Sequence, residues 1–173
     1  MDIFRNVCIG CVVWCCNSIS TYIKEGEIVK ELVIYESGKM SGLTMKEMRA
    51  WRDCFKTTIT QVAENSDVKV KVINPVDYYN FEFPRHQSEL EIMQFDLARV
   101  KESDLIVVNL DGLSTSIGTI IECYEAYKRD IPVLAFGSDE DYEKLHPWTK
   151  CCITRHDKNY RECINYISDF YMT

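Results

Sequence analysis

The sequence predicts an α/β fold, because segments typical of buried strands alternate with segments typical of amphipathic helices along most of the chain. Strands that alternate with helices form βαβ units, in which the helix returns the chain so that the next strand runs parallel. The 173 residues, 46% of them hydrophobic, are enough for one core. We therefore expect a single-domain, three-layer sandwich, Rossmann-like or flavodoxin-like, with a mostly parallel sheet of four to five strands.

The first part of this pattern is a strand, a helix and a second strand. Residues 32–35 form a short apolar run that indicates a buried strand, and a turn rich in serine and glycine follows it. Thr44 and Glu47 have the spacing of a capping box, so a helix is expected over residues 44–63. Residues 68–73 alternate apolar side chains with lysines, which predicts the second strand.

The middle of the chain repeats this order. Ser88 and Glu91 again have capping-box spacing, and the helix that they open should extend over residues 88–102. Residues 104–110 are an almost unbroken apolar run, which is typical of a strand covered on both faces. A short polar loop separates this strand from a helix expected over residues 117–128.

The last part of the chain completes the sheet. Residues 131–136 predict a fourth strand that ends at a glycine, and residues 151–154 are the weaker candidate for a fifth. Residues 159–171 have helical periodicity and should close the domain. No internal repeat, low-complexity tract or linker divides this region, so one core is expected.

The first residues do not follow the alternating pattern. We therefore divide the chain into an N-terminal extension of residues 1–30, rich in cysteine and of unknown role, and an α/β domain of residues 31–173. The apolar run of the extension breaks at Asn17, too early to span a bilayer, and no signal-peptide cleavage site follows it. Cys8 and Cys11 have the spacing that opens a zinc site, but no second pair completes it. We expect the extension to pack against the domain; a metal site, an interaction arm or a later start of translation are the alternatives.

Composition excludes several classes of partner. The net charge of −7 argues against a nucleic-acid polymer, since phosphate contacts need clustered Lys and Arg, and no segment suggests a membrane partner. The nine cysteines are odd in number and several fall in helical patterns, so we expect reduced thiols in a cytoplasmic protein. The histidines show no metal spacing, and neither a Walker loop nor a dinucleotide fingerprint is present. No metal and no cofactor are therefore expected.

Three loops should meet at one edge of the sheet. Ligands of parallel sheets bind outside the carboxyl ends of the strands. The loops that follow those ends cover residues 37–43, 74–87 and 111–117. The second loop contains an aromatic stretch, residues 78–83, which is a candidate oligomer interface or substrate lid. The sequence predicts the functional site at this edge.

Glu122 is the first candidate for a chemical role. Gly118 and Ala126 lie one turn before and after it on the same helix face, and such small neighbours leave space over the carboxylate. The alternative is a solvated helix residue, favoured near the positive end of the helix dipole.

Asp96 shares a helix face with the apolar side chains of Met93 and Val100. A buried carboxylate is costly unless it is paired or its pKa rises. Asp96 could therefore bond a buried backbone group, or it could line a site, where a raised pKa would suit proton transfer to a leaving group.

Polar residues near two predicted element ends could contact an anion. Residues 114–119 enter a helix N-terminus, where hydroxyls and free N–H groups bind anions, although Ser114 or Ser116 could simply cap the helix. Lys39 stands in the glycine-rich turn after the first strand and is a plausible phosphate contact. Tyr35 ends that strand, either as a core residue or with its hydroxyl directed into the site.

In chain order, these segments resemble the nucleoside 2-deoxyribosyltransferase family over about residues 31–137. The matching segments are residues 35–42 (YESGKMSG), 95–97 (FDL) before 103–108 (SDLIVV), and 116–122 (SIGTIIE) before 131–133 (IPV). The occurrence of these segments in this order is what makes the resemblance specific.

The resemblance implies a reaction and a site. A glutamate of that family attacks the anomeric carbon and displaces the base, and this role falls on Glu122. The aspartate that contacts or protonates the base falls on Asp96, and the tyrosine that positions the nucleophile falls on Tyr35. The substrate-binding positions that it implies are Gly38, Lys39, Ser41, Gly42, Ser116, Gly118 and Thr119. It also implies a nucleoside or nucleotide substrate, a free nucleobase and a homo-oligomer of two or more copies.

The sequence departs from the transferase pattern at Ser116, where transferases often carry an acidic residue. The related 2'-deoxynucleoside 5'-phosphate N-hydrolases have serine there, but they usually have another serine where Lys39 stands. We therefore expect a deoxyribosyltransferase or close relative. A nucleotide N-hydrolase is the first alternative, and a non-catalytic nucleotide-binding or sensing module is the second.

Overall fold

The computed structural model describes residues 20–24, 27–79 and 83–173, so most of the predicted extension, with Cys8 and Cys11, lies outside the described residues. The long strand β2 (Glu27–Ser37) organises the sheet. Its parallel partners are β3 (Val68–Ile73) along one edge and β4 (Leu105–Asn109) along the other. Beyond β4 follow β5 (Val133–Phe136) and β6 (Arg155–Asp157), both parallel.

The parallel strands thus have the order β3-β2-β4-β5-β6, which is the flavodoxin-like order and confirms the predicted fold class. The sheet is larger than predicted, because β1 (Ser20–Lys24) adds a sixth strand, antiparallel to the first half of β2. β2 begins at Glu27, so the expected division at residue 30 falls inside this strand.

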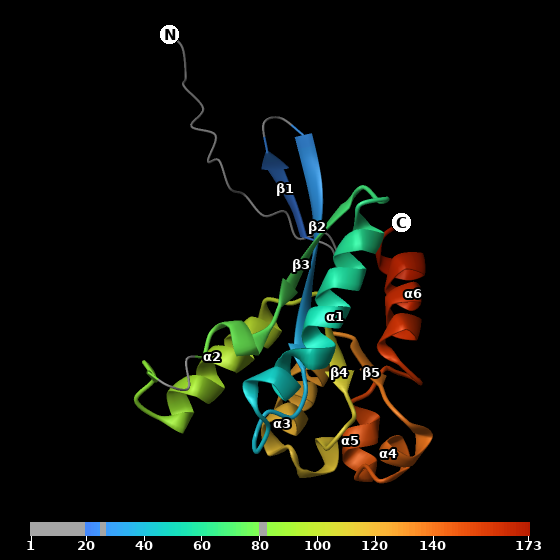
Figure 1. Cartoon of the computed structure of the whole chain (residues 1–173). Helices are drawn as coiled ribbons and strands as arrows, with labels where there is room; N and C mark the ends of the chain where they lie inside the picture. Colours follow the sequence, from blue (N-terminus) through green and yellow to red (C-terminus); the bar gives the residue numbers. More distant parts are fainter. Residues whose placement is uncertain (1–19, 25–26, 80–82) are drawn as a thin grey trace.

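Helices cover both faces of the sheet (Figure 1). One face packs against α1 (Met45–Ala63) and α6 (Tyr160–Tyr171), and the other against α2 (Glu89–Lys101) and α3 (Ile117–Tyr127). Strand alternation explains the division. In β2, Leu32 and Ile34 belong to the core under α1 and α6, whereas Val33 and Tyr35 belong to the core under α2 and α3. The three predicted layers are therefore present.

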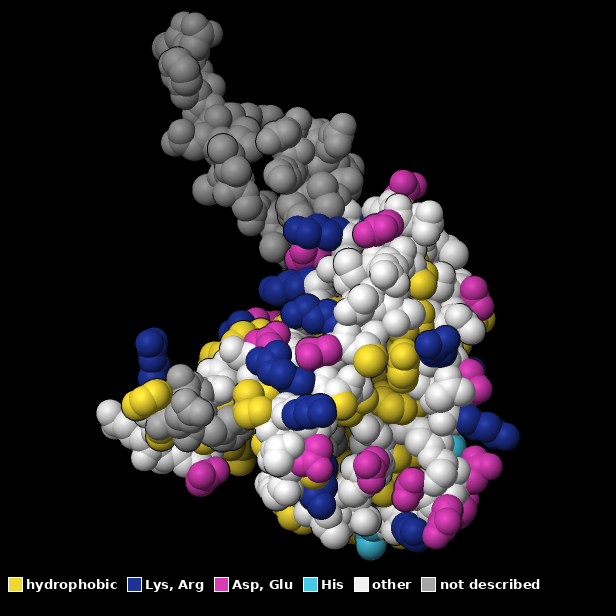
Figure 2. Space-filling view, viewed as in Figure 1, with side chains coloured by type: hydrophobic (Ala, Val, Ile, Leu, Met, Phe, Trp, Pro, Cys, Tyr) yellow, Lys and Arg dark blue, Asp and Glu magenta, His cyan; other side chains and the backbone are white. Residues whose placement is uncertain are grey.

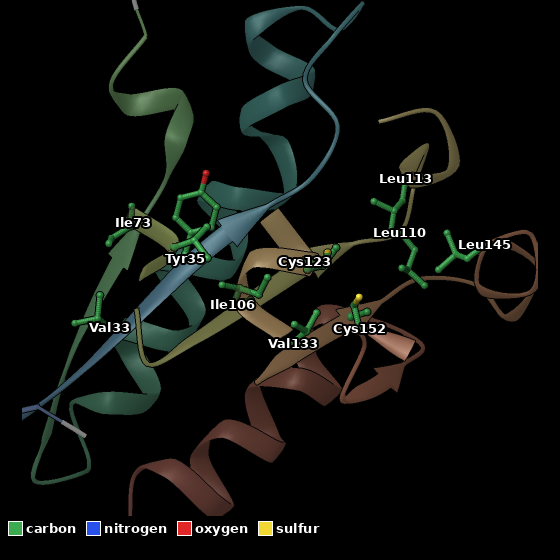
Figure 3. Close-up of a cluster of buried hydrophobic side chains, with 14 residues drawn as sticks. Val33, Tyr35, Ile73, Ile106, Leu110, Leu113, Cys123, Val133, Leu145 and Cys152 are labelled. Atoms are coloured by element: carbon green, nitrogen blue, oxygen red, sulfur yellow. The ribbon is translucent and has the colours of Figure 1, made fainter. Parts of the chain in front are cut away.

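The core under α2 and α3 includes residues of several strands (Figure 3). Tyr35 lies among them, and its hydroxyl points away from the other labelled side chains. Cys123 of α3 and Cys152 are also buried in this core, and both are free thiols that act as small apolar residues.

The helix starts explain where the chain turns. Thr44 and Glu47 form the predicted capping box at α1. At α2 only half of the predicted box forms: Ser88 accepts from the backbone N–H of Glu91, while the Glu91 carboxylate accepts from the backbone N–H of Gln87. The Glu91 carboxylate thus bonds the backbone N–H one residue before the N-cap, and the helix still starts where it was expected.

The predicted fifth strand at residues 151–154 is wrong. Pro147 opens a short helix, α5 (Pro147–Cys151), and the fifth parallel strand is β6, which follows it. The segment contains an apolar run because Cys152 and Ile153 pack against the core after the end of the helix. A second short helix, α4 (Asp139–Glu143), precedes α5, and acidic side chains gather over it in Figure 2.

Candidate active site

A cavity of about 1180 Å³ opens at the carboxyl ends of β2 and β4. The three predicted loops meet here, since each contributes lining residues: Gly38 from the first, His86 from the second and Ser116 from the third. Pockets that hold small organic ligands usually measure about 300–1,000 Å³, so this cavity has room for a nucleoside-sized molecule.

Glu122 lies at the floor of this cavity, on the first turns of α3, and only 8% of it is exposed. Both of its carboxylate oxygens accept a hydrogen bond from β2. Tyr35 donates its hydroxyl to Oε1 at 2.8 Å, and Ser37 donates its hydroxyl to Oε2. Tyr35 and Ser37 reach the same carboxylate because residues two apart on a strand face the same side. The alternative of a solvated Glu122 is therefore wrong.

The environment of Glu122 holds its pKa at about 7. Burial raises this pKa most, the hydrogen bond from Ser37 lowers it, and the nearby Asp96 raises it again. The bond from Tyr35 and the charge of Arg52 lower it further. The phenol of Tyr35 has a pKa raised well above its ordinary value by burial and by Glu122, so it stays a donor. At neutral pH a large fraction of Glu122 is thus an ionised carboxylate held in a fixed orientation.

Asp96 faces Glu122 across the same cavity, from α2. It is also only 8% exposed, and its Oδ1 accepts a hydrogen bond of 2.5 Å from the hydroxyl of Tyr79. Burial raises the pKa of Asp96, and the Tyr79 bond and His86 offset part of that rise. Of the two interpretations of its apolar helix face, lining a cavity is the one that the structure supports. A carboxyl with a raised pKa can donate a proton.

Aromatic rings form the wall beside Asp96. Tyr79 and His86 line the cavity, and their rings meet edge to face at 5.2 Å between centroids. Phe95 packs behind them against Tyr78, at 5.5 Å. Tyr79 belongs to the aromatic stretch that was predicted as an interface or lid, and its contact with Asp96 was not predicted. Its place after a strand at the carboxyl edge was the available signal.

The opposite wall is formed by the start of α3. Ser116 does not cap this helix with its side chain; its hydroxyl lies 2.9 Å from that of Thr119. Both residues line the cavity together with Gly118, where an added Cβ would meet no atom within 4 Å. The hydroxyls and the helix N-terminus therefore face open space.

The glycine turn after β2 supplies the remaining predicted positions. Gly38, Ser41 and Gly42 line the cavity. Lys39 does not: its side chain lies over Gly112, so closely that a Cβ there would be 2.6 Å from the lysine Cδ. Tyr35 is not in the lining either and reaches the site only through Glu122.

Apolar side chains complete the cavity: Met40, Met48, Ile92, Met93, Leu97, Ile117 and Ile121. They come from the first loop and from α1, α2 and α3. The cavity thus combines an apolar slot with two carboxyl groups and a set of hydroxyls. Such a combination suits a flat, partly apolar ring linked to a polyol.

Within the described residues, no three His, Cys, Asp or Glu side chains gather in a way that could hold a metal ion. None of the helices in this part of the chain is both long and apolar enough to cross a membrane.

No family model and no curated protein matches the sequence. Solved structures do match in fold. A conserved protein from Enterococcus faecalis V583 superposes with a TM-score of 0.59 at 18% identity, covering 80% of this chain and 98% of its own. The 2-deoxyribosyltransferase from Bacillus psychrosaccharolyticus superposes with a TM-score of 0.51 at 16% identity, covering 78% of this chain and 91% of its own. These similarities establish a shared α/β fold, and one of the proteins with this fold is a 2-deoxyribosyltransferase.

Proposed function

We propose that this protein cleaves or transfers at the N-glycosidic bond of a nucleoside, preferably a deoxynucleoside, with Glu122 as the nucleophile. The observation that carries the proposal is the geometry of Glu122: a buried carboxylate with both oxygens hydrogen-bonded, facing a cavity that also contains Asp96. The fold shared with a 2-deoxyribosyltransferase supports the same conclusion.

The reaction follows from the chemistry of the two carboxyl groups. An oxygen of Glu122 attacks the anomeric carbon while the bond to the base nitrogen breaks through an oxocarbenium-like transition state. Asp96, whose pKa is raised by burial, acts as the general acid and in its protonated form donates its proton to the departing base. The product is a glycosyl ester of Glu122. Water or a second base then attacks the anomeric carbon, gives its proton to Asp96 and releases the Glu122 carboxylate.

Tyr35 and Ser37 act on Glu122 both before it attacks the sugar and when the glycosyl ester breaks. Their hydroxyls keep the free carboxylate oriented before attack and stabilise the negative charge that returns to it when the ester breaks. The apolar slot between α2 and α3 accommodates the base, and the hydroxyls of Ser116 and Thr119 lie where sugar substituents would be bound.

The test is to incubate the protein with a panel of nucleosides and 5'-monophosphates, with and without an acceptor base, and to follow the products by chromatography. We expect a free base, or an exchanged nucleoside, that is not formed by the Glu122→Ala variant. Binding without turnover in the wild-type protein would contradict the proposal and favour a nucleotide-binding or sensing module.

A nucleotide N-hydrolase is the second candidate, and the start of α3 favours it. The side chain of Ser116 leaves the first N–H groups of α3 uncapped, and Gly118 keeps the approach open. A helix N-terminus of this kind favours a phosphate group. Release of free base from a 5'-monophosphate, with no transfer of the sugar to an acceptor base, would identify the protein as a nucleotide N-hydrolase.

We also propose that the protein acts as a homo-oligomer. Leu90 of α2 and Ile117, Ile121 and Tyr124 of α3 are exposed large apolar residues, and Ile117 and Ile121 also line the cavity. A second copy that covered them would remove this apolar surface from water and close the site. Light scattering should detect a dimer or larger assembly, and a fully active monomer would contradict the proposal.

A further inference from the structure

A cluster of buried polar side chains lies behind the site, on the α1 side of the sheet. Glu36 stands between Tyr35 and Ser37 in β2 and therefore points to the opposite face of the sheet. Arg52 of α1 and Asn74 at the end of β3 are buried with it: Glu36 and Arg52 are 0% exposed and Asn74 is 1% exposed. None of these residues lines the cavity.

Arg52 connects this cluster to the site. Its guanidinium donates to the backbone carbonyl of Gly38 at 2.9 Å and to that of Met48 at 2.6 Å. The group also lies over the ring of Trp51, 4.7 Å from its centroid. Gly38 lines the cavity and directly follows Ser37, whose hydroxyl is bonded to Glu122. One guanidinium thus ties helix α1 to the residue beside a hydrogen-bond donor of Glu122.

Arg52 is not neutralised by a close ion pair. Although Glu36 is near enough to influence it, both carboxyl oxygens of Glu36 and Nε of Arg52 have no hydrogen-bond partner among the described residues. Burial raises the pKa of Glu36 to about 9, and Arg52 offsets only part of that rise. Glu36 is therefore uncharged at neutral pH and does not neutralise Arg52, whereas Glu122 is a second carboxyl group whose charge acts on the guanidinium.

Stability alone does not explain such an arginine. A buried guanidinium with an unpartnered N–H is costly, and apolar residues of similar volume often stabilise such positions. The side chain instead supplies two properties that an apolar residue lacks: a bidentate hold on two carbonyls and a positive charge behind the carboxyl end of β2.

We propose that Arg52 is a positioning residue of the active site, which holds the Gly38 carbonyl so that Ser37 remains against Glu122. Its charge acts in the same direction, because it favours the ionised carboxylate. The groups that act on Glu122 are Ser37 and Tyr35 of β2, Asp96 of α2 and Arg52 of α1. Arg52 is the only cation among these four. The role in turnover rests on the proposed function; the effect on Glu122 does not.

The test compares three variants in α1. Arg52→Met removes the charge and both hydrogen bonds, Arg52→Lys keeps the charge without the bidentate hold, and Arg49→Met is the control. Arg49 lies one turn away and contacts Asp77 and the Val76 carbonyl, not the turn after β2. The first measurement is the titration of Glu122 by NMR of carboxyl-labelled glutamate, assigned with Glu122→Gln, which needs no substrate.

We expect Arg52→Met to raise the pKa of Glu122 by about one unit, a tenfold loss of ionised carboxylate below neutral pH. Arg52→Lys keeps the charge but loosens the turn beside Ser37, so it should raise this pKa by less than Arg52→Met does. It should lose at least tenfold in kcat with little change in KM. Arg49→Met should match the wild type in both. If Arg52→Met does not fold, the kcat of Arg52→Lys tests the proposal in its place.

An unchanged Glu122 titration in folded Arg52→Met, or wild-type kcat in Arg52→Lys, would overturn the proposal. If the wild-type protein turns over no nucleoside, the proposed function fails. The titration still decides whether Arg52 acts on Glu122.

Discussion

The phenolic oxygen of Tyr35 lies 2.8 Å from Oε1 of Glu122, although 87 residues separate them in the chain. The tyrosine ring is fully buried in the core under α2 and α3, so the hydroxyl is held on a rigid support. Both interpretations of Tyr35 from the sequence therefore apply at once: it is a core residue and it directs its hydroxyl at the candidate nucleophile. Such a donor opposes the rise in pKa that burial imposes on Glu122.

The first prediction concerns the pH dependence of turnover. Glu122 must be ionised to attack, and its pKa is about 7, so kcat/KM should rise with pH through neutrality. Tyr35→Phe and Ser37→Ala each remove a donor that lowers this pKa, so each should move the acid limb to higher pH. We expect roughly one pH unit, since a hydrogen bond to a charged group contributes about 1.5–3 kcal/mol and a protonated carboxyl keeps part of it.

The control for this experiment is Tyr127→Phe, an exposed tyrosine at the end of the same helix as Glu122. It should keep the wild-type profile. An acid limb that stays in place in both Tyr35→Phe and Ser37→Ala would show that these hydroxyls do not act on the titrating group.

The second prediction is that Glu122→Ala loses turnover by several orders of magnitude while the fold is retained, because the covalent nucleophile is gone. Glu122→Gln should behave alike, since an amide of the same shape cannot attack. Circular dichroism and thermal unfolding check the fold, and single-turnover assays check the chemistry. Wild-type rates in either variant would remove Glu122 from the mechanism.

The elements that hold these residues are largely predictable from the sequence, and their contacts are not. Periodicity and capping predict α1, α3 and β3, because those signals depend on neighbours in the chain. The bonds of Ser37 to Glu122 and of Tyr79 to Asp96 span 85 and 17 residues. They depend on strand register and on the path of a loop, which no local pattern contains.

The third prediction compares the loss of the general acid Asp96 with the loss of its hydrogen-bond partner Tyr79. Asp96→Asn keeps the shape but removes the proton, so kcat should fall about 10²- to 10⁴-fold with little change in KM. A substrate whose base leaves without protonation should recover most of that rate. Tyr79→Phe should cost less, about tenfold, because Asp96 keeps its carboxyl group and loses only its 2.5 Å hydrogen bond to the tyrosine hydroxyl. A raised KM with unchanged kcat in Asp96→Asn would indicate a purely binding role.

The fourth prediction concerns the buried Glu36. Its pKa is about 9 in the folded protein, against an ordinary value of 4.5 in the unfolded chain, so the folded state binds more protons between these limits. Its contribution to stability is therefore complete below pH 4.5 and is lost as pH rises toward 9. Glu36→Gln imitates the protonated form at every pH. The variant should exceed the wild type by an amount on the order of 3 kcal/mol at pH 7.

Urea unfolding at several pH values measures this difference, and Glu64→Gln, at the exposed end of α1, is the control. The two stability curves should converge near pH 4.5, where the Glu36 carboxyl is half protonated even when unfolded. Destabilisation by Glu36→Gln at neutral pH would mean that Glu36 is ionised and paired with Arg52, because breaking a buried pair is costly.

Two segments lie elsewhere in the structure than the sequence predicts, and for the same kind of reason. The lysine of the glycine turn was expected at a phosphate, but its side chain lies over Gly112 outside the cavity lining. Residues 151–154 were expected as a strand, but they follow Pro147 at the end of a short helix. In both cases the local pattern, a cation after a strand or an apolar run, was identified correctly. The packing of a neighbouring segment then places the side chain or the backbone differently from what the pattern predicts.

The last prediction concerns the 5'-phosphate. The hydroxyls of Ser116 and Thr119 and the uncapped start of α3 face the cavity, and the adjacent Gly118 leaves the approach open. A helix N-terminus with hydroxyl donors favours an anion even in an acidic protein. We therefore expect a deoxynucleoside 5'-monophosphate to be at least as good a substrate as the free deoxynucleoside, as measured by kcat/KM.

Ser116→Asp should reverse that order, because a carboxylate at the same position repels the phosphate and can bind a free hydroxyl. Lys39→Ala is the informative comparison, since a lysine outside the lining should leave the ratio of the two kcat/KM values unchanged. If Lys39→Ala abolishes the preference, the lysine moves into the site when phosphate binds. If the monophosphate is tenfold worse in the wild type, about 1.4 kcal/mol, the start of α3 does not hold phosphate. The free nucleoside is then the substrate, and base exchange becomes the better assignment.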